Sequence, residues 1–221
     1  ANLGIAQVES LLKEKNEQAI LDLVGELRAD GLIVHVNPLQ EWFQPEGDRI
    51  EKPPIETIEN LLSRLDVPII VKEVGQGMGT ESLKKLLRLP LAAIEFAAFG
   101  GTNFSKLELM RDDPEMQETY QPFAYVGQTA SQMVQSVNRL LQEIEEPQCR
   151  QLIISGGIKT YLDGYYLVSV SQLPAVYGMA SAVLRHATGN YSELKHFITN
   201  QLKAYRLAQN YLKINPDYDG E

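Results

Sequence analysis

The sequence has little cysteine and few cationic side chains for its length. One cysteine, Cys149, in 221 residues excludes a disulfide framework and a zinc site built from several cysteines, and favours the cytoplasm as compartment. Lys and Arg number 20 against 29 Asp and Glu, a formal net charge of −9. Nucleic acid is therefore not expected as the main partner, because phosphate backbones bind to basic faces. The sequence also has no apolar run near the roughly 18 residues of a membrane span, so we expect no membrane partner.

Short apolar runs alternate with amphipathic segments along the whole chain. Strands are predicted at residues 32–36, 68–71, 91–96, 151–154 and 175–177, and helices at 9–29, 55–65, 81–89, 129–144, 162–170 and 192–213. Such alternation is typical of βαβ units and predicts an α/β fold with a parallel sheet. Residues 1–221 are interpreted as a single domain. The polar stretch 112–128 is expected to be a mobile loop.

An unusual polar or glycine-rich segment follows each predicted strand. These segments read HVNPLQE, KEVGQG, FGGTN, SGGIK and GMAS. In parallel α/β folds, ligands bind at the carboxyl ends of the strands. Five such segments suit a TIM (β/α)₈ barrel better than an open sheet.

Glycine pairs follow two of the later strands, at Gly100-Gly101 and Gly156-Gly157. Glycine allows backbone N–H groups to approach an anion closely, and turns on the last two strands of a barrel often form a phosphate site. Each pair also fits an ordinary tight turn. Lys72 ends another strand, where it could face an anion or the electron-rich edge of a cofactor, or simply extend to solvent.

The densest polar cluster is His35-Val36-Asn37-Pro38-Leu39-Gln40-Glu41. Alternation along the strand would place His35 and Asn37 on one face, with Gln40 and Glu41 beyond a turn at Pro38. Glu41 suits Mg²⁺, which prefers oxygen ligands and usually keeps substrate phosphates in its coordination shell. The alternative is a polar loop around a buried histidine.

Taken together, HVNPLQEWFQPEGDR, VKEVGQGM, FGGTNFSKLELMR and SGGIK resemble the type 2, FMN-dependent isopentenyl-diphosphate isomerase family, as does the opening Ala-Asn-Leu-Gly. The resemblance implies a flavin-binding TIM barrel that interconverts isopentenyl and dimethylallyl diphosphate. It implies reduced FMN as an acid–base cofactor, Mg²⁺ to hold the diphosphate and NADPH as the reductant. A homotetramer or homo-octamer is expected.

The same resemblance implies roles for particular residues. Gln40 would lie beside the isoprenoid double bond as the catalytic residue, His35 and Asn37 would help to bind the substrate, and Glu41 would hold the Mg²⁺. The residues expected to bind FMN are Asn2, Lys72 and Thr102, with Gly156, Gly157, Ala180 and Ser181 at its phosphate.

The sequence departs from the family at several places. Ala97 stands where family members usually offer a hydroxyl to the flavin. The segment that carries the first two βα units of the barrel has no counterpart here, so we expect this chain to be the C-terminal portion of a longer enzyme. Two alternatives stay open: another FMN-dependent barrel oxidoreductase, and a non-catalytic barrel fragment. The oxidoreductase needs a His with an Arg partner near the late strands, and neither occurs between Gly156 and Ser181.

Overall fold

A six-stranded parallel sheet forms the centre of the computed structural model, which describes residues 1–44, 49–111 and 113–215. The strands follow chain order: β1 Asn2–Gly4, β2 Leu32–His35, β3 Ile69–Lys72, β4 Ala93–Glu95, β5 Leu152–Ile154 and β6 Ala175–Tyr177. The parallel α/β sheet predicted from the sequence is confirmed. Strand β1 was not expected, because three residues are too few to give a readable apolar pattern.

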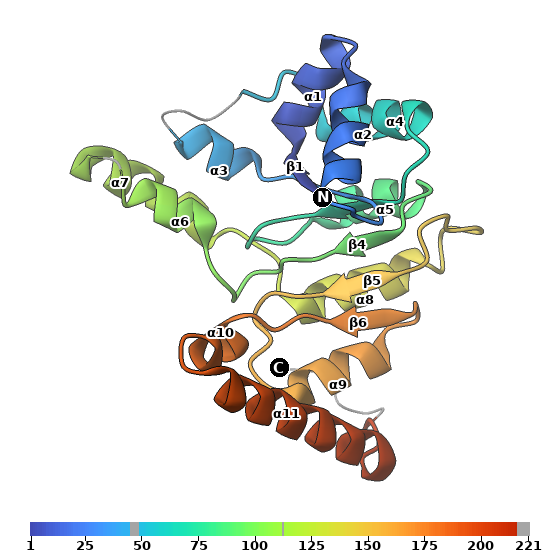
Figure 1. Ribbon diagram of the computed structural model, residues 1–221, viewed down its shortest axis with the longest axis vertical. Helices are drawn as coiled ribbons and strands as arrows, with labels where there is room; N and C mark the ends of the chain where they lie inside the picture. The colour runs from blue at the N-terminus through green and yellow to red at the C-terminus, as the bar shows by residue number, and fades with distance from the viewer. Residues whose placement is uncertain (45–48, 112, 216–221) are drawn as a thin grey trace.

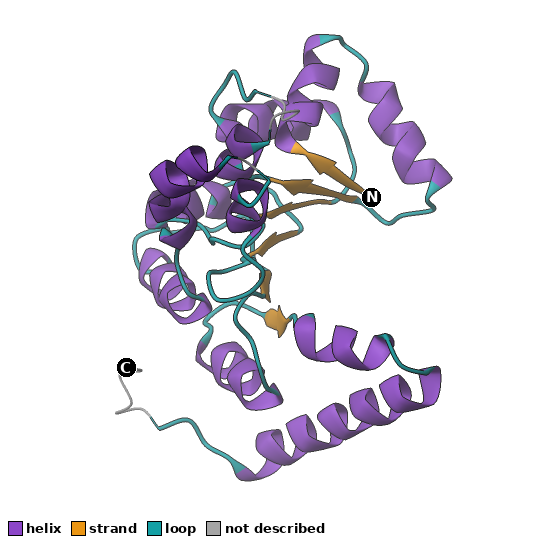
Figure 2. Ribbon diagram, turned by 90° about the vertical axis from the view of Figure 1, so that its left-hand side faces the viewer, coloured by secondary structure: helices purple, strands orange, loops and turns teal. Residues whose placement is uncertain are grey.

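Helices connect the strands and cover one side of the sheet. They are α1 Ile5–Lys13, α2 Glu17–Glu26, α3 Pro38–Phe43, α4 Pro54–Arg64, α5 Thr80–Leu87, α6 Phe104–Leu109, α7 Pro114–Tyr120, the 3₁₀ helix η1 Gln121–Tyr125, α8 Ala130–Leu140, α9 Tyr161–Val170, α10 Ser181–Ala187 and α11 Tyr191–Tyr211. Figure 1 shows their order along the sheet. Figure 2 shows the strands following an arc from β1 to β6, with most helices outside it.

The two faces of the sheet differ in their burial. On the face toward the helices, Val34, Val71, Ile94 and Leu152 are neighbours in register, and each is at most 1% exposed. On the other face, Ile153 is half-buried and its partner Val176 is 61% exposed. The main hydrophobic core therefore lies between the sheet and the outer helices.

The expectation of one helical segment over residues 9–29 was wrong. The segment contains the end of α1 and all of α2, with a break between them at which Lys15 has a φ of 56°. A lysine in the left-handed region is uncommon and ends a regular helix. The break allows the two helices to pack against each other.

The expectation of a mobile loop over 112–128 was also wrong for the residues that are described. They contain α7 and η1, and the side chain of Asp113 caps α7 by accepting a hydrogen bond from the Met116 N–H at 3.0 Å. This insertion packs on α3 and α6 through a second, smaller hydrophobic cluster of Phe43, Leu109 and Ala124. Figure 1 shows α3, α6 and α7 on the side toward which the strand arrows point.

The 21-residue helix α11 is amphipathic and packs against α9 and α10. Within the described parts of the chain, no helix combines the length and the apolar character that crossing a membrane requires.

The burial of the two sheet faces predicts a difference between two alanine substitutions on neighbouring strands. Ile94→Ala should lower the free energy of unfolding by about 2–5 kcal/mol, because it opens a cavity in a filled core. Ile153→Ala should cost clearly less, because Ile153 is already partly exposed. Urea unfolding of both variants, compared with the unaltered chain, measures the difference, and equal losses would contradict this description of the faces.

Candidate functional site

The carboxyl ends of the central strands bring three ionisable side chains into one row. His35 pairs with Lys72, and Lys72 pairs with Glu95, as Cα partners in register. Because side chains alternate along a strand, residues in register on adjacent strands share a face. Glu95 was not predicted as a site residue from the sequence. The one indication there is that a carboxylate follows the apolar residues Ala93 and Ile94.

The loops after β3, β4, β5 and β6 enclose a cavity of about 570 Å³. Of the seven residues predicted to bind FMN, the six that line this cavity are Lys72, Thr102, Gly156, Gly157, Ala180 and Ser181. They come from four segments that are distant in the sequence. Glu95 and Ser155 also line the cavity.

Two glycines of this cavity, Gly75 and Gly156, are in positions that only a residue without a side chain can occupy. Gly156 has a φ of +88°, and a Cβ added to it would lie 2.1 Å from the Ala98 carbonyl oxygen. Gly75 has a φ of +135°, and its Cβ would lie 2.3 Å from the Thr102 carbonyl oxygen. The loops thus approach each other through their backbones. A wall of this kind offers main-chain groups to an anionic ligand.

Lys72 is held inside the cavity. It is half-buried, and its Nζ donates a hydrogen bond to the Glu73 carbonyl oxygen at 2.8 Å. Burial lowers the pKa of Lys72, although the negative charges of Glu95 and Glu73 act in the opposite direction. The side chain therefore does not simply extend to solvent. Its ammonium group can interact with a negatively charged part of a ligand in the cavity.

Glu73 organises the loop that follows Lys72. Its Oε2 accepts hydrogen bonds from the backbone N–H groups of Gly75, Gln76 and Gly77, at 2.6, 2.5 and 2.9 Å. Burial raises the pKa of this carboxyl, and the backbone hydrogen bonds offset part of the rise. A carboxylate that accepts three amides fixes the conformation of the turn.

Gln76 joins the same turn to the insertion. Its Nε2 donates to the carbonyl oxygens of Phe123 and Val126, at 3.0 and 2.6 Å, and its Oε1 accepts from the Ser105 hydroxyl at 2.6 Å. Both side chains are buried, so these bonds satisfy groups that water cannot reach. Neither Glu73 nor Gln76 was recognised from the sequence. The partners of Gln76 are set by tertiary contacts, whereas those of Glu73 are the N–H groups of the turn that follows it.

His35 and Asn2 interact at the ends of β2 and β1. The His35 Nδ1 and the Asn2 Oδ1 are 3.2 Å apart. Burial lowers the pKa of His35, and the positive charge of Lys72 lowers it further. The structure thus places Asn2 with the predicted substrate residue His35, while the other six predicted FMN residues line the cavity described above.

Asn37 does not continue strand β2. The strand ends at His35, and Asn37 instead caps α3, with its Oδ1 accepting a hydrogen bond from the Gln40 N–H at 2.9 Å. Because the strand ends two residues before Asn37, the alternation along β2 does not decide where Asn37 lies relative to His35. Pro38 begins the helix, as its fixed φ favours.

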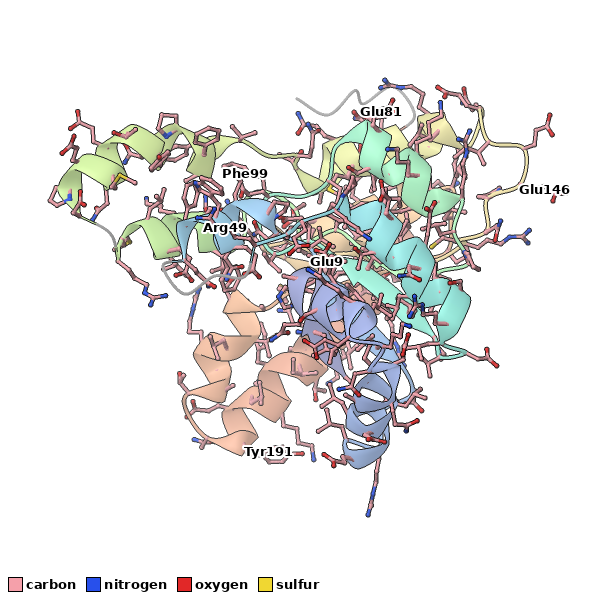
Figure 3. The ribbon with its side chains drawn as sticks, turned by 90° about the horizontal axis from the view of Figure 1, so that it is seen from above. Glu9, Arg49, Glu81, Phe99, Glu146 and Tyr191 are labelled. Atoms are coloured by element: carbon pink, nitrogen blue, oxygen red, sulfur yellow. The ribbon has the colours of Figure 1, made fainter. Side chains whose placement is uncertain are left out.

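Gln40 and Glu41 lie half-buried on α3. Among the described residues, no group of three or more His, Cys, Asp or Glu side chains could hold a metal ion, so the predicted Mg²⁺ site depends on Glu41. Residues 45–48 of the HVNPLQEWFQPEGDR motif lie outside the described residues. After them, the Arg49 guanidinium lies 5.6 Å from the centroid of the Trp42 ring. Arg49 is labelled in Figure 3.

Comparisons with known proteins found curated relatives but no matching family model. The chain is 32% identical over 209 residues to an isopentenyl-diphosphate delta-isomerase of Synechocystis sp., covering 94% of this chain and 57% of that protein. It is 33% identical over 199 residues to the Vibrio campbellii protein of the same name, covering 89% of this chain and 56% of that protein. The chain thus spans a little over half the length of these relatives.

Among solved structures, a mandelate oxidase variant with the monooxide FMN adduct aligns with a TM-score of 0.47 and 10% identity, over 87% of this chain and 54% of that chain. A TM-score of this size does not establish a shared fold.

The environment of His35 predicts a titration that depends on Lys72. The pKa of His35 should lie below that of a free histidine, and Lys72→Met should raise it without restoring the usual value, because burial remains. Since the folded state resists protonation of His35, this residue should reduce stability as the pH falls through its usual pKa toward the folded one. NMR titration of the three histidine rings measures this, with Lys84→Met as the control. An unchanged His35 pKa in Lys72→Met would disprove the coupling.

The backbone contact at Gly156 predicts a large cost for a single methyl group. Gly156→Ala should destabilise the chain by about 3 kcal/mol or more, because it adds left-handed strain to a steric clash. In Gly25→Ala, where a Cβ on α2 would meet no atom within 4 Å, we expect a gain of about 0.5–1 kcal/mol. Thermal unfolding compares the two, and a tolerated Gly156→Ala would show that the loops are not in close contact.

Proposed function

We propose that this chain belongs to an isopentenyl-diphosphate isomerase that interconverts isopentenyl and dimethylallyl diphosphate with reduced FMN and Mg²⁺. The observation that carries the proposal is the cavity at the strand ends. Residues from four separate loops, matched to a flavin site by sequence motif alone, line this one cavity. The similarity to named isomerases supports the same substrate class.

The cavity suits a flavin mononucleotide in size and in chemistry. Its volume of about 570 Å³ lies within the range of cofactor sites. The turn at Gly156 and Gly157, with Ala180 and Ser181, would hold the phosphate with main-chain groups and a hydroxyl. Lys72 would face the N1/O2 edge of the ring, where its charge stabilises an anionic reduced flavin, and Thr102 would contact the cofactor from the next loop. When bound, the reduced flavin supplies the acid–base group for a reaction with no net redox change.

Helix α3 would provide the substrate side of the site. The cluster of Phe43, Leu109 and Ala124 holds α3 against the insertion, which leaves Gln40 and Glu41 half-buried. Gln40 would lie beside the double bond as the catalytic residue. Glu41 would hold Mg²⁺ on the diphosphate, with oxygen ligands of the kind that this ion prefers.

His35 and Asn37 would assist from opposite ends of the same connection. His35, at the end of β2, would contact the substrate beside Lys72. Asn37 would help to orient the substrate through α3, because Asn37 caps the first turn of this helix. Asn2 would reach the cofactor region through its contact with His35.

We further propose that the six-stranded sheet forms part of an eight-stranded barrel, completed by two βα units that this chain lacks. The strand order, the arc in Figure 2 and the partly exposed inner face at Val176 support this arrangement. Closing the arc with two further strands would give the edges of β1 and β6 hydrogen-bonding partners.

NADPH as reductant, a cytoplasmic location and a homotetramer or homo-octamer belong to the same proposal. The oxidoreductase alternative is weaker, because the segment from Gly156 to Ser181 contains no His or Arg.

The proposal is tested by assaying the protein at its natural length with isopentenyl diphosphate. We expect conversion to dimethylallyl diphosphate only when FMN is reduced and Mg²⁺ is present. Gln40→Asn should lower kcat by about 100-fold or more, as expected for loss of a group that assists proton transfer. The exposed Gln18→Asn on α2 serves as the matched control.

Two results would reject this function. One is turnover with oxidised FMN and no reductant, and the other is full activity in Gln40→Asn. Absence of flavin absorbance together with absence of turnover would favour the non-catalytic alternative.

A further inference from the structure

A second cavity, of about 580 Å³, lies beside strand β3 and is distinct from the flavin cavity. Val71 and Glu73 line this second cavity, whereas Lys72 and Val74 line the first. Because successive side chains of an extended segment point to opposite faces, the two cavities lie on opposite sides of β3 and of the residues that follow it. We call the second one the outer cavity. Of the residues given a role in the function proposed above, Asn37 lines this cavity, and the function assigns no ligand to the cavity itself.

The walls of the outer cavity are mainly aliphatic. They come from the first turns of α3 and α4, from the β3 loop and from α5, and include Val36, Leu39, Ile55, Ile58, Met78 and Leu86. A cavity of this volume with apolar walls and a few polar groups has the character of a small-molecule site. An aliphatic chain would displace water from these walls favourably.

One buried polar group in the outer cavity lacks a partner. Asn37 is 3% exposed and lines the cavity, and its Nδ2 makes no hydrogen bond within the described residues. Its Oδ1 is already used by the Gln40 N–H, so the amide cannot be turned around without loss of the cap on α3. A buried donor without an acceptor is unfavourable, and a ligand oxygen in the cavity would satisfy it.

The charged groups of the outer cavity favour an anionic ligand. Lys85, on the exposed side of α5, lines the cavity, and no ion pair is found for it among the described residues. The preceding Lys84 is instead paired with Glu143 at 2.6 Å. Glu73 also lines the cavity, but its Oε2 already accepts three backbone N–H groups, which counter its negative charge. Two donors that line the cavity have no acceptor within the described residues, the Asn37 Nδ2 and the Lys85 ammonium.

We propose that the outer cavity binds an aliphatic carboxylate of medium chain length. The chain would lie along Ile55, Ile58 and Met78. The carboxylate would accept a hydrogen bond from the Asn37 Nδ2 and would lie in the field of Lys85. A carboxylate matches these groups because it only accepts hydrogen bonds and carries the opposite charge to Lys85.

Isothermal titration calorimetry with sodium octanoate tests the site on the protein at its natural length. We expect saturable binding at one site, and weaker binding of octan-1-ol, which has the same chain without the charge. FMN at saturating concentration should not displace octanoate, because the two cavities lie on opposite sides of β3. This measurement needs no catalytic activity, so it can fail while the proposed isomerase activity holds, and the reverse is also true.

Two substitutions test the two polar contacts. Asn37→Asp keeps the oxygen that caps α3 but replaces the Nδ2 donor with an acceptor, so it should weaken octanoate binding about tenfold or more. Lys85→Gln on the exposed face of α5 should weaken it about two- to threefold, since exposed charges are screened. Lys84→Gln on the same helix is the matched control and should leave octanoate affinity unchanged.

The proposal is overturned if octanoate shows no saturable binding, or if octanol binds as tightly as octanoate. Displacement of octanoate by FMN would also overturn it. Because Lys85 is exposed, its variant reports on the site even if Asn37→Asp proves too unstable to study. Unchanged octanoate affinity in Lys85→Gln would contradict the proposal that the ligand of the outer cavity carries a negative charge.

Discussion

The register of the parallel strands is the constraint on which the site depends. Each strand pairs with the next one in the chain, so every carboxyl end, and every loop that follows one, lies along the same edge. This register aligns His35, Lys72 and Glu95. A shift of one residue in β3 would turn Lys72 toward the helices and Val71 toward the cavity. The burial of Val34, Val71 and Ile94 against the helices opposes such a shift, so the hydrophobic core also determines where the charges lie.

Backbone interactions then give the loops at this edge their shape. Gly156 fits against Ala98, and Gly75 against Thr102, because neither glycine carries a side chain. Around Glu73 the loop is shaped differently, by a carboxylate that collects three amide hydrogens. Gln76 extends this network to the insertion. The shape of the cavity thus depends on close contacts between the backbones of neighbouring loops. The charged side chains lie within a cavity whose shape these contacts determine.

The same arrangement makes β3 the boundary between two different environments. On its inner side, Lys72 lies near Glu95 in a cavity bordered by glycine loops. On its outer side, Val71 borders an apolar cavity whose one unpaired buried donor belongs to Asn37 among the residues described. Asn37 also caps α3, the helix that carries Gln40. A change of packing in the outer cavity can therefore affect the position of this helix.

The local sequence determined the kinds of element and the places where the chain can turn. Apolar runs predicted β2 to β6, and each predicted strand end lies within two residues of the observed one. The motifs around Lys72, Gly100 and Gly156 identified the loops that meet at the site. These features were readable because they depend on near neighbours: alternation in a strand, periodicity in a helix, and the freedom of glycine.

The tertiary structure decided which residues face one another. The strand at Asn2 forms through its pairing with Ile33, a distant part of the chain. The roles of Gln76 and Glu95 are of the same kind, since the hydrogen bonds of Gln76 reach residues about 50 positions away and Glu95 acquires its neighbours from two other strands. The type of a residue determines which hydrogen bonds and ion pairs its side chain can make. Which distant residue becomes the partner is determined by the tertiary structure.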